Sequence, residues 1–424
     1  MACFVLSFIT GDWLTTLAKG LFFFLLAVVV ADIILLFRIK KGLAGQRSTP
    51  EKLSNGDENE IVIQLQNFYP FKTDLTVIDE IPHQFQRRDL SFKLTLERGE
   101  SKFIRYHLRP VKRGEYSFGA VNAFASSPLG FLSRRFRFSG DAIVPVYPSY
   151  IQMRKYELMA ISNRLSEAGI KLIRRIGQNR EFELIKEYVT GDDFRTVNWR
   201  ATARRNAIMV NHYQDEKSQQ VYSLIDKGRV MQMPFNGLSL LDYAINASLV
   251  ISNIAIKKSD KAGLVTFQDR IGSIVPASKQ NKQMFRIMET LFNQKTAYRE
   301  SDFSSLYIHV RRKITQRSLL LLFTNFETIY GLQRQLPYLN RLSDQHLLVV
   351  IFFENTEMQS MLQQPANSLK AVYHKAVAEK LSYDKKLIVK ELAKHGIQAM
   401  LTAPESLTVN TINKYLELKA RGMI

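Results

Sequence analysis

Cysteine is nearly absent from this sequence, and so are the motifs that mark the common enzyme classes. The only cysteine is Cys3, so neither an internal disulfide nor a cysteine-based metal site can form. The chain has no glycine-rich phosphate loop ending in GKS or GKT, no G-x-S-x-G turn, no H-E-x-x-H helix and no C-x-x-C pair. These absences predict that the protein is not an enzyme.

Histidine is also sparse, and its seven residues are scattered singly along the chain. Lone histidines usually serve as hydrogen-bonded structural residues, and only His212 lies near a charged motif. Asp192 and Asp193 are neighbours in sequence, which gives weak support for shared acid and base work. We therefore predict no catalytic residues, no metal and no other cofactor.

Positive charge dominates what the sequence does contain. The formal net charge is +20, which favours anionic partners such as nucleic acid, an anionic membrane surface or an acidic protein. Hydrophobic residues make up 46% of the 424 residues, so the chain is expected to fold into two or three domains.

The N-terminal region, residues 1–40, is predicted to be a membrane anchor. Residues 20–37 are almost purely apolar and close to the ~20 residues that a helix needs to span a bilayer. Their single charge, Asp32, is expected near the headgroups or paired within a helix bundle. A cleaved signal peptide is less favoured, because no small-residue cleavage site follows. Basic residues come next and predict that the rest of the chain is cytoplasmic: Arg38, Lys40, Lys41 and Arg47.

A second apolar run, residues 2–9, is too short to span a bilayer. Gly11 and Asp12 follow it, as in a turn outside the membrane. This pattern raises the hypothesis that the anchor is a helical hairpin whose first helix is clipped.

Residues 55–148 show an alternation of apolar and polar side chains. One run places Ile61, Ile63 and Leu65 on a common face, and similar runs cover residues 90–96 and 104–108. Turn pairs ending in glycine separate these runs. The pattern predicts an antiparallel β-sandwich that acts as a spacer or a docking surface.

Residues 218–424 instead alternate solid apolar strands with amphipathic helices. The predicted strands cover residues 221–226, 263–267, 318–324, 346–353 and 396–402. Apolar strands joined by helices predict an α/β domain with a mostly parallel, doubly wound sheet. Ligands bind at the carboxyl ends of such strands, which points to Asp226, Gln268, Asp269, Thr324 and Asn325.

Between these domains, residues 149–217 are expected to form a polar linker region that carries the segment EYVTGDDFRTVNWRATAR, 187–204. We expect a turn at Gly191 and a helix capped by Asn198. The favoured interpretation is an internal clamp, in which Asp193 pairs with an arginine, Arg195 or Arg204, and Trp199 is a buried anchor between domains. A partner-docking face comes second. Nucleic-acid binding is least favoured, because three acidic residues lie in the same stretch.

The chain resembles the bacterial domain-of-unknown-function fifty-eight proteins. The resemblance is carried by EYVTGDDFRTVNWRATARRNAIMVNHYQDE (187–216) and by VYSLIDKGRVM (221–231). It implies a membrane-anchored protein with a von Willebrand factor A-like domain, which binds a MoxR-type AAA+ ATPase in protein maturation or envelope stress. A metal-dependent hydrolase or a nucleic-acid-processing protein on the same scaffold is the alternative.

The resemblance also implies a site where von Willebrand A domains often hold Mg²⁺ through D-x-S-x-S and residues of two further loops. Here Asp226 is kept, but Gly228 and Val230 replace both serines. Asn325 stands in the third loop, and Ser301 is the candidate in the second. Magnesium prefers carboxylate and other hard oxygens, so this degenerate set predicts no bound metal. Asp226 is then expected to cap a turn or to pair with Lys227 or Arg229.

Overall fold

The computed structural model describes residues 12–87, 90–138, 140–161, 181–190, 192, 194–214, 218–296, 298–363, 365 and 368–424. The chain divides into two compact units, Met1–Tyr147 and Pro148–Ile424. Residues 149–217, expected as a separate linker, fall within the second unit. The apolar run at 2–9 lies outside the described residues.

Helix α2, Asp12–Phe37, opens the described chain. Its segment Thr16–Phe37 is long and apolar enough to cross a membrane, and only 11% of that segment is buried by the rest of the protein. The core helix α5, Leu240–Lys257, passes the same test of length and composition, but 78% of it is buried. Of these two helices in the described residues, only α2 therefore presents an apolar surface that a bilayer could cover.

The Asp32 carboxylate in α2 was expected near the headgroups or paired within a helix bundle, and in the structure its partners belong to the β-rich part of the first unit. The carboxylate is fully buried, and it accepts hydrogen bonds from the Ser127 hydroxyl at 2.6 Å and the Leu132 amide at 3.1 Å. Burying a carboxylate is tolerated only when such donors compensate for the lost water.

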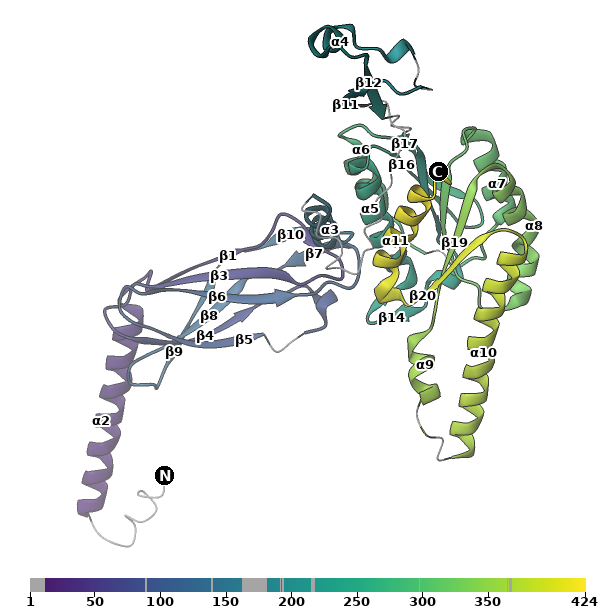
Figure 1. Ribbon diagram of the computed structural model, residues 1–424. Coiled ribbons are helices and arrows are strands. Elements are labelled where there is room, and N and C mark those ends of the chain that lie inside the picture. The colour runs from purple at the N-terminus through teal and green to yellow at the C-terminus, as the bar shows by residue number, and fades with distance from the viewer. Residues whose placement is uncertain are drawn as a thin grey trace. The chain divides into compact units, whose positions relative to one another are not determined.

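The rest of the first unit is a set of mostly antiparallel sheets around one apolar core, which we call the sandwich (Figure 1), with one parallel pair at Leu53–Ser54. Ile61, Ile63 and Leu65 are each 0% exposed on one face of a strand, which confirms the predicted alternation. The sheets have the orders β1-β3-β6, β2-β10-β7 and β5-β4-β8-β9. Their strands are β1 Leu43–Ser48, β2 Leu53–Ser54, β3 Asn59–Asn67, β4 Thr73–Asp79, β5 Ser91–Leu96, β6 Ser101–Leu108, β7 Gly114–Phe118, β8 Val121–Ser126, β9 Ser133–Phe138 and β10 Ala142–Tyr147.

The second unit contains a six-stranded sheet of order β17-β16-β13-β18-β19-β20. Five strands are parallel and confirm the predicted strands: β13 Gln220–Asp226, β16 Lys261–Phe267, β18 Leu319–Phe323, β19 Leu347–Phe353 and β20 Gln398–Thr402. The edge strand β17, Ile271–Ser278, is antiparallel and was not predicted. Most of its side chains are partly exposed and it contains Pro276, so it lacks the solid apolar run of its neighbours.

Helices pack on both faces of this sheet, as β13 shows. Val221 and Ile225 belong to one apolar core with α5, whereas Tyr222 and Leu224 belong to another. Successive side chains of a strand point to opposite faces, so the two cores lie on opposite faces. The first core also includes residues of α3 Tyr150–Ile161, α6 Gln283–Phe292 and α11 Leu407–Ala420. The second includes α7 Phe303–Lys313, α8 Ile329–Gln345 and α10 Leu369–Lys394.

The segment 187–204 lies mainly between the strands of a hairpin, β11 Glu181–Glu187 and β12 Met209–Gln214. Between them are η3, Phe194–Thr196, and the short helix α4, Trp199–Arg205. The Asn198 side chain accepts the Ala201 amide at 3.0 Å and caps α4, which confirms the predicted cap and helix start.

Candidate functional site

Asp226 ends strand β13 at the carboxyl edge of the parallel strands and is 0% exposed. Its Oδ1 accepts hydrogen bonds from the Gly228 amide at 2.8 Å and from the Ser301 hydroxyl. Its Oδ2 accepts the Thr324 hydroxyl at 2.7 Å. Burial raises the pKa of Asp226, and these three donors partly oppose that rise. The carboxylate thus caps the turn after β13 and ties together two neighbouring loops.

The missing side chain at Gly228 leaves room for the Ser301 hydroxyl that donates to Asp226. A Cβ at 228 would lie 2.0 Å from the Ser301 Oγ, a separation that no side chain can adopt. The backbone itself, with φ −71°, suits any residue, so the exclusion is purely steric. The Ser301 hydroxyl therefore fills the space that a side chain at 228 would need.

Asn325 follows Thr324 and faces a cation that belongs to the protein. Its Oδ1 accepts a hydrogen bond from the Lys385 ammonium, and its Nδ2 donates to the Val230 carbonyl at 3.4 Å. A divalent ion at Asp226 would have to displace the Ser301 and Thr324 hydroxyls and lie close to this ammonium. Within the described ranges, no group of three His, Cys, Asp or Glu residues could hold a metal. The residues present fit an internal hydrogen-bond cluster better than a metal site.

Lys227 and Arg229 were the alternative partners of Asp226. Arg229 instead lies 3.6 Å from Glu300, which Arg334 also contacts at 3.0 Å. Burial lowers the pKa of Lys227, and the Asp269 carboxylate partly opposes this shift. Arg229, Glu300 and Arg334 line a charged hollow of about 170 Å³ beside Asp226.

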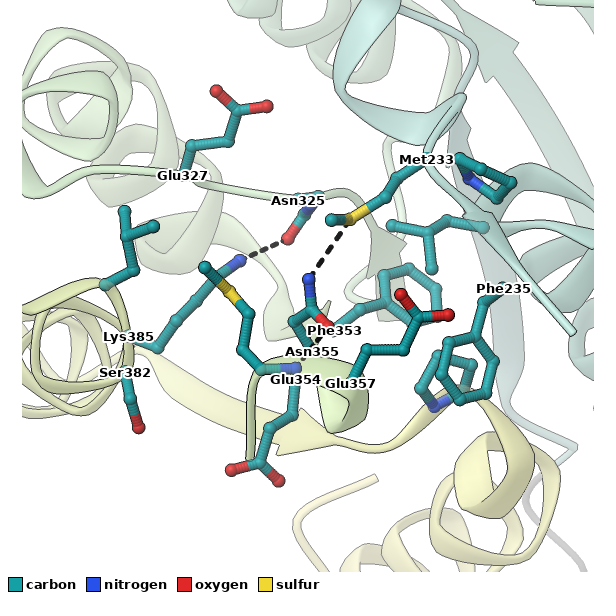
Figure 2. A pocket seen from close by; sticks show the side chains of 15 residues that line it. Met233, Phe235, Asn325, Glu327, Phe353, Glu354, Asn355, Glu357, Ser382 and Lys385 are labelled. Atoms are coloured by element: carbon teal, nitrogen blue, oxygen red, sulfur yellow. Dashed lines mark hydrogen bonds between the residues drawn. The ribbon is translucent and has the colours of Figure 1, made fainter. Parts of the chain in front are cut away.

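A second cavity of about 210 Å³ lies beside Asn325, and Figure 2 shows its lining. We call it the sheet-edge cavity, lined among others by Met233, Phe235, Asn325, Phe353 and Lys385. Figure 2 places the Lys385 ammonium against Asn325, with aromatic rings on the other side of the cavity. Glu327, Glu354 and Glu357 also contribute to the lining. The cavity therefore combines apolar walls with one partly buried cation among three glutamates, which suits an apolar side chain next to a polar group.

Lys385 is partly buried in helix α10. Burial lowers the pKa of Lys385 to about 8, although the Glu327 carboxylate acts in the opposite direction. The ammonium form thus persists at neutral pH and is lost just above it.

The sequence analysis missed Lys385, although a signal for it exists. Ala378, Ile388 and Leu392 are buried on α10, and Leu381 lies on the same stripe at spacings of three and four residues. Lys385 occupies the stripe position between Leu381 and Ile388. A lysine within an apolar stripe of a long helix marks a cation that faces inward.

The segment 187–204 lines a different hollow from Asp226. Gly191 and Asp193 lie outside the described residues, and of Arg195 only the backbone, within η3, is described. Asp192 closes the turn, because it accepts the Val189 amide at 3.1 Å and lies 2.9 Å from Lys186. Arg204 is exposed and lines the hollow together with Asn198 and Met209.

Trp199 is 72% exposed at the start of α4. The clamp interpretation required a buried anchor at this position, and that requirement is wrong for the described structure. Helix α4 has only seven residues and lies between two strands, so among the described residues it has no packed layer beside it that could cover a large indole. An exposed tryptophan beside arginines suits the docking interpretation instead.

Comparisons with known proteins assign no activity to this chain. Residues 185–361 match the family model described as a protein of unknown function, DUF58. The uncharacterized protein YeaD of Bacillus subtilis (strain 168) is 26% identical over 212 residues, which cover 48% of this chain and 52% of that protein. The chain thus spans about half the length of the curated relative that it matches. Both findings support the resemblance to the DUF58 proteins.

Two solved structures show distant likeness. The conserved hypothetical protein BatB from Bacteroides thetaiotaomicron covers 48% of this chain and 100% of its own, at 11% identity and a TM-score of 0.33. A CARDB domain from Pyrococcus furiosus covers 26% of this chain and 94% of its own, at 14% identity and a TM-score of 0.19.

Proposed function

We propose that this protein is a membrane-anchored, non-enzymatic adaptor that holds a protein partner at its sheet edge. The partner class, a MoxR-type AAA+ ATPase acting in protein maturation or envelope stress, comes from the resemblance of residues 187–231. The strand order of the second unit, with Asp226 after a central strand, supports the von Willebrand factor A-like interpretation that the resemblance implies.

The observation that carries this proposal is the sheet-edge cavity. It lies near Asp226, whose carboxylate oxygens already accept hydrogen bonds from the protein. The walls of the cavity include Met233, Phe235 and Phe353, and its polar side contains the Lys385 ammonium together with three glutamates. A protein partner could insert an apolar side chain and place a hydrogen-bond acceptor near Lys385. Because Asp226 is bonded to Ser301 and Thr324, the same edge would dock that partner without a metal.

The proposed location is the inner (plasma) membrane of a bacterium, with both soluble units in the cytoplasm. Helix α2 supplies the apolar span, and Arg38, Lys40 and Lys41 follow it as exposed basic residues. Positive charge next to a span favours the cytoplasmic side. Arg47, which we counted in the same basic stretch, is buried against Asp79 and does not face the lipid.

The test is recovery of the partner from native membranes with detergent-solubilised full-length protein, followed by mass spectrometry. Lys385→Met should lose the ATPase, because it removes the cation of the sheet-edge cavity while keeping a long apolar side chain. Lys386→Met is the matched control, since it removes the same charge from the exposed neighbouring residue. Chelation of Mg²⁺ should leave recovery with the unmodified protein unchanged, provided that nucleotide is absent.

The pH dependence of recovery gives a second readout. The pKa of Lys385 is about 8, so its hydrogen bond to an acceptor of the partner should weaken as the pH rises through that value. The Lys386→Met protein should show the same decline, and the Lys385→Met protein should show none. Equal recovery by both variants would place the partner elsewhere, and failure to recover an ATPase with any protein would overturn the adaptor proposal.

A further inference from the structure

Helix α2 is fastened to the sandwich of the first unit at its C-terminal end. The Arg134 guanidinium donates to the carbonyls of Leu36 and Ile39, each at 2.7 Å, and to that of Lys40 at 3.0 Å. The Tyr69 hydroxyl donates to the Leu36 carbonyl at 2.9 Å. The last carbonyls of a helix lack partners within the helix and favour a nearby cation. These contacts hold the sandwich directly against the helix end.

A second attachment lies further along the helix. Asp32, fully buried, binds the Ser127 hydroxyl and the Leu132 amide, at the two ends of the loop that joins β8 to β9. Figure 1 shows α2 meeting the sandwich at the end where β9 begins. Asp32 precedes the helix end by five residues, which corresponds to about 8 Å along the axis. The loop, residues 127–132, is therefore held beside the apolar span and not beyond it.

The tip of this loop is apolar and exposed. Leu129 is 47% exposed and Phe131 is 54% exposed, and residues 127–132 contain no charged side chain. The Gly130 amide donates to the Ser127 carbonyl at 3.1 Å and to the Ser127 hydroxyl at 3.0 Å. Gly130 has a φ of +79°, which glycine adopts without strain. The turn thus satisfies several of its own polar groups with internal hydrogen bonds, and it exposes two large apolar side chains.

We propose that this loop inserts Leu129 and Phe131 into the boundary between the lipid headgroups and the acyl chains. The proposal rests on α2 crossing the bilayer. The 22-residue segment Thr16–Phe37 spans about 33 Å, slightly more than a hydrocarbon core of ~30 Å. When the hydrocarbon core covers most of this segment, Asp32 lies at the depth of that boundary or just inside it. The loop bound there would otherwise expose its apolar tip to water, next to a helix face covered by lipid.

The charges around the loop fit the same placement. Arg38, Lys40 and Lys41 are exposed directly after the span, where they can reach the headgroups. Arg134 donates to the Leu36 carbonyl of the helix and to two carbonyls just after it, and its guanidinium lies 5.0 Å from the centre of the Phe37 ring, which places its charge at the helix end. The first unit would then contact the membrane through a helix and an adjacent loop, which fixes its tilt relative to the bilayer.

The test uses full-length protein in phosphatidylcholine vesicles, with Cys3 replaced by serine and a single cysteine introduced at Leu129 for an environment-sensitive fluorophore. Part of the lipid carries bromine near the headgroup end of the acyl chains, where it quenches nearby probes. Ile143→Cys is the matched control: Ile143 is a 67% exposed apolar residue on β10. It follows β9, which runs away from the loop for about 20 Å, so it lies at the far end of the sandwich.

We expect brominated lipid to reduce the fluorescence at position 129 and to leave position 143 unchanged. Phe131→Cys provides a second probe of the same tip in case the label at 129 disturbs folding. Quenching at 129 and 131 no stronger than at 143, in protein that floats with the vesicles, would overturn the loop insertion alone. Protein that does not float would overturn the membrane anchor itself. The sheet-edge adaptor proposal is read out separately by ATPase recovery.

Discussion

Two buried aspartates, Asp79 in the first unit and Asp226 in the second, have their charges compensated in different ways. In the sandwich, Asp79 lies 2.6 Å from Arg47, and both side chains are at most 1% exposed. The Tyr106 hydroxyl also donates to Asp79, and Arg47 donates in addition to the carbonyls of Gly119, at 2.9 Å, and Gly140. At the sheet edge, Asp226 has only the neutral donors of Gly228, Ser301 and Thr324.

The difference lies in what the partners can do when the carboxylate changes. A guanidinium only donates hydrogen bonds and keeps its charge, so Arg47 requires an anion at Asp79. A hydroxyl can turn and accept, so Ser301 and Thr324 can adapt to a different group at Asp226. The ion pair of Arg47 and Asp79, which we call the sandwich lock, is therefore a rigid structural site. The site around Asp226 can tolerate a change of the carboxylate, and it lies next to a cavity that we propose for docking.

The largest effect is expected for Asp79→Asn in the sandwich. The variant leaves the Arg47 charge buried without its anion, which costs about 3–5 kcal/mol in the free energy of unfolding. Hydrogen–deuterium exchange followed by mass spectrometry should show the loss in β3, β4 and β8, while the sheet of the second unit stays protected. The double variant Arg47→Met with Asp79→Leu should recover much of the stability, because it removes both charges. Equal exchange in the single variant and the unmodified protein would contradict the lock.

Next in size is Gly228→Ala at the sheet edge. The added methyl group meets the Ser301 hydroxyl, and the forced shift should destabilise the second unit by about 1–3 kcal/mol. Thermal unfolding followed by differential scanning fluorimetry measures the change. The double variant with Ser301→Ala removes the obstructing oxygen and should be more stable than Gly228→Ala alone. A single variant as stable as the unmodified protein would mean that Ser301 is free to move.

Much of this architecture could be predicted from the sequence, because local patterns determine it. The alternation at Ile61, Ile63 and Leu65 and the solid apolar run of β18 both reflect how many faces of a strand are buried. Strand β17 was missed because an edge strand is covered on fewer sides and carries no such run. The Asn198 cap was predicted correctly, since a cap depends on only a few consecutive residues.

The long-range contacts could not be predicted in the same way. The bond between Ser127 and Asp32 joins residues 95 positions apart, and Lys385 reaches Asn325 across 60 positions. Neither contact leaves a local pattern beyond a polar residue in an apolar stretch. The exposure of Trp199 was also mispredicted, because tryptophan is usually buried and the sequence does not show which layer would cover it. The sequence analysis named Asp226, Ser301 and Thr324 as candidates, and the structure brings all three together, but the sequence did not show that both hydroxyls donate to the carboxylate.

A smaller effect is expected for Thr324→Val, which removes one of the three donors to Asp226 and nearly preserves shape. The loss should be about 1–2 kcal/mol, in the range of one hydrogen bond to a carboxyl group. Thr324→Ser keeps the hydroxyl and should retain most of that contribution, apart from a lost methyl group. Urea-dependent pulse proteolysis of both variants gives the comparison. If valine and serine were equally stable, the hydroxyl at 324 would not support Asp226.

The smallest effect, and the sharpest test of the comparison, is expected for Asp226→Asn. Because Ser301 and Thr324 can turn to accept from an amide, the variant should lie within about 1 kcal/mol of the unmodified protein at neutral pH. Burial raises the pKa of Asp226 in the folded protein above its value in the unfolded chain. The folded state then holds the proton more tightly, so the contribution of Asp226 is fully present below the unfolded pKa. It is lost as the pH rises through the raised folded pKa.

The stability of the unmodified protein relative to Asp226→Asn should therefore fall as the pH rises from about 4, the unfolded value, and then level off. Urea unfolding midpoints of both proteins at matched pH, followed by circular dichroism, measure this difference and cancel the titration of every other group. A relative stability that instead increases with pH would show that the three donors outweigh burial and that Asp226 is a stabilised anion. Asp226 would then resemble Asp79 of the sandwich lock, and the contrast between these two buried aspartates would disappear.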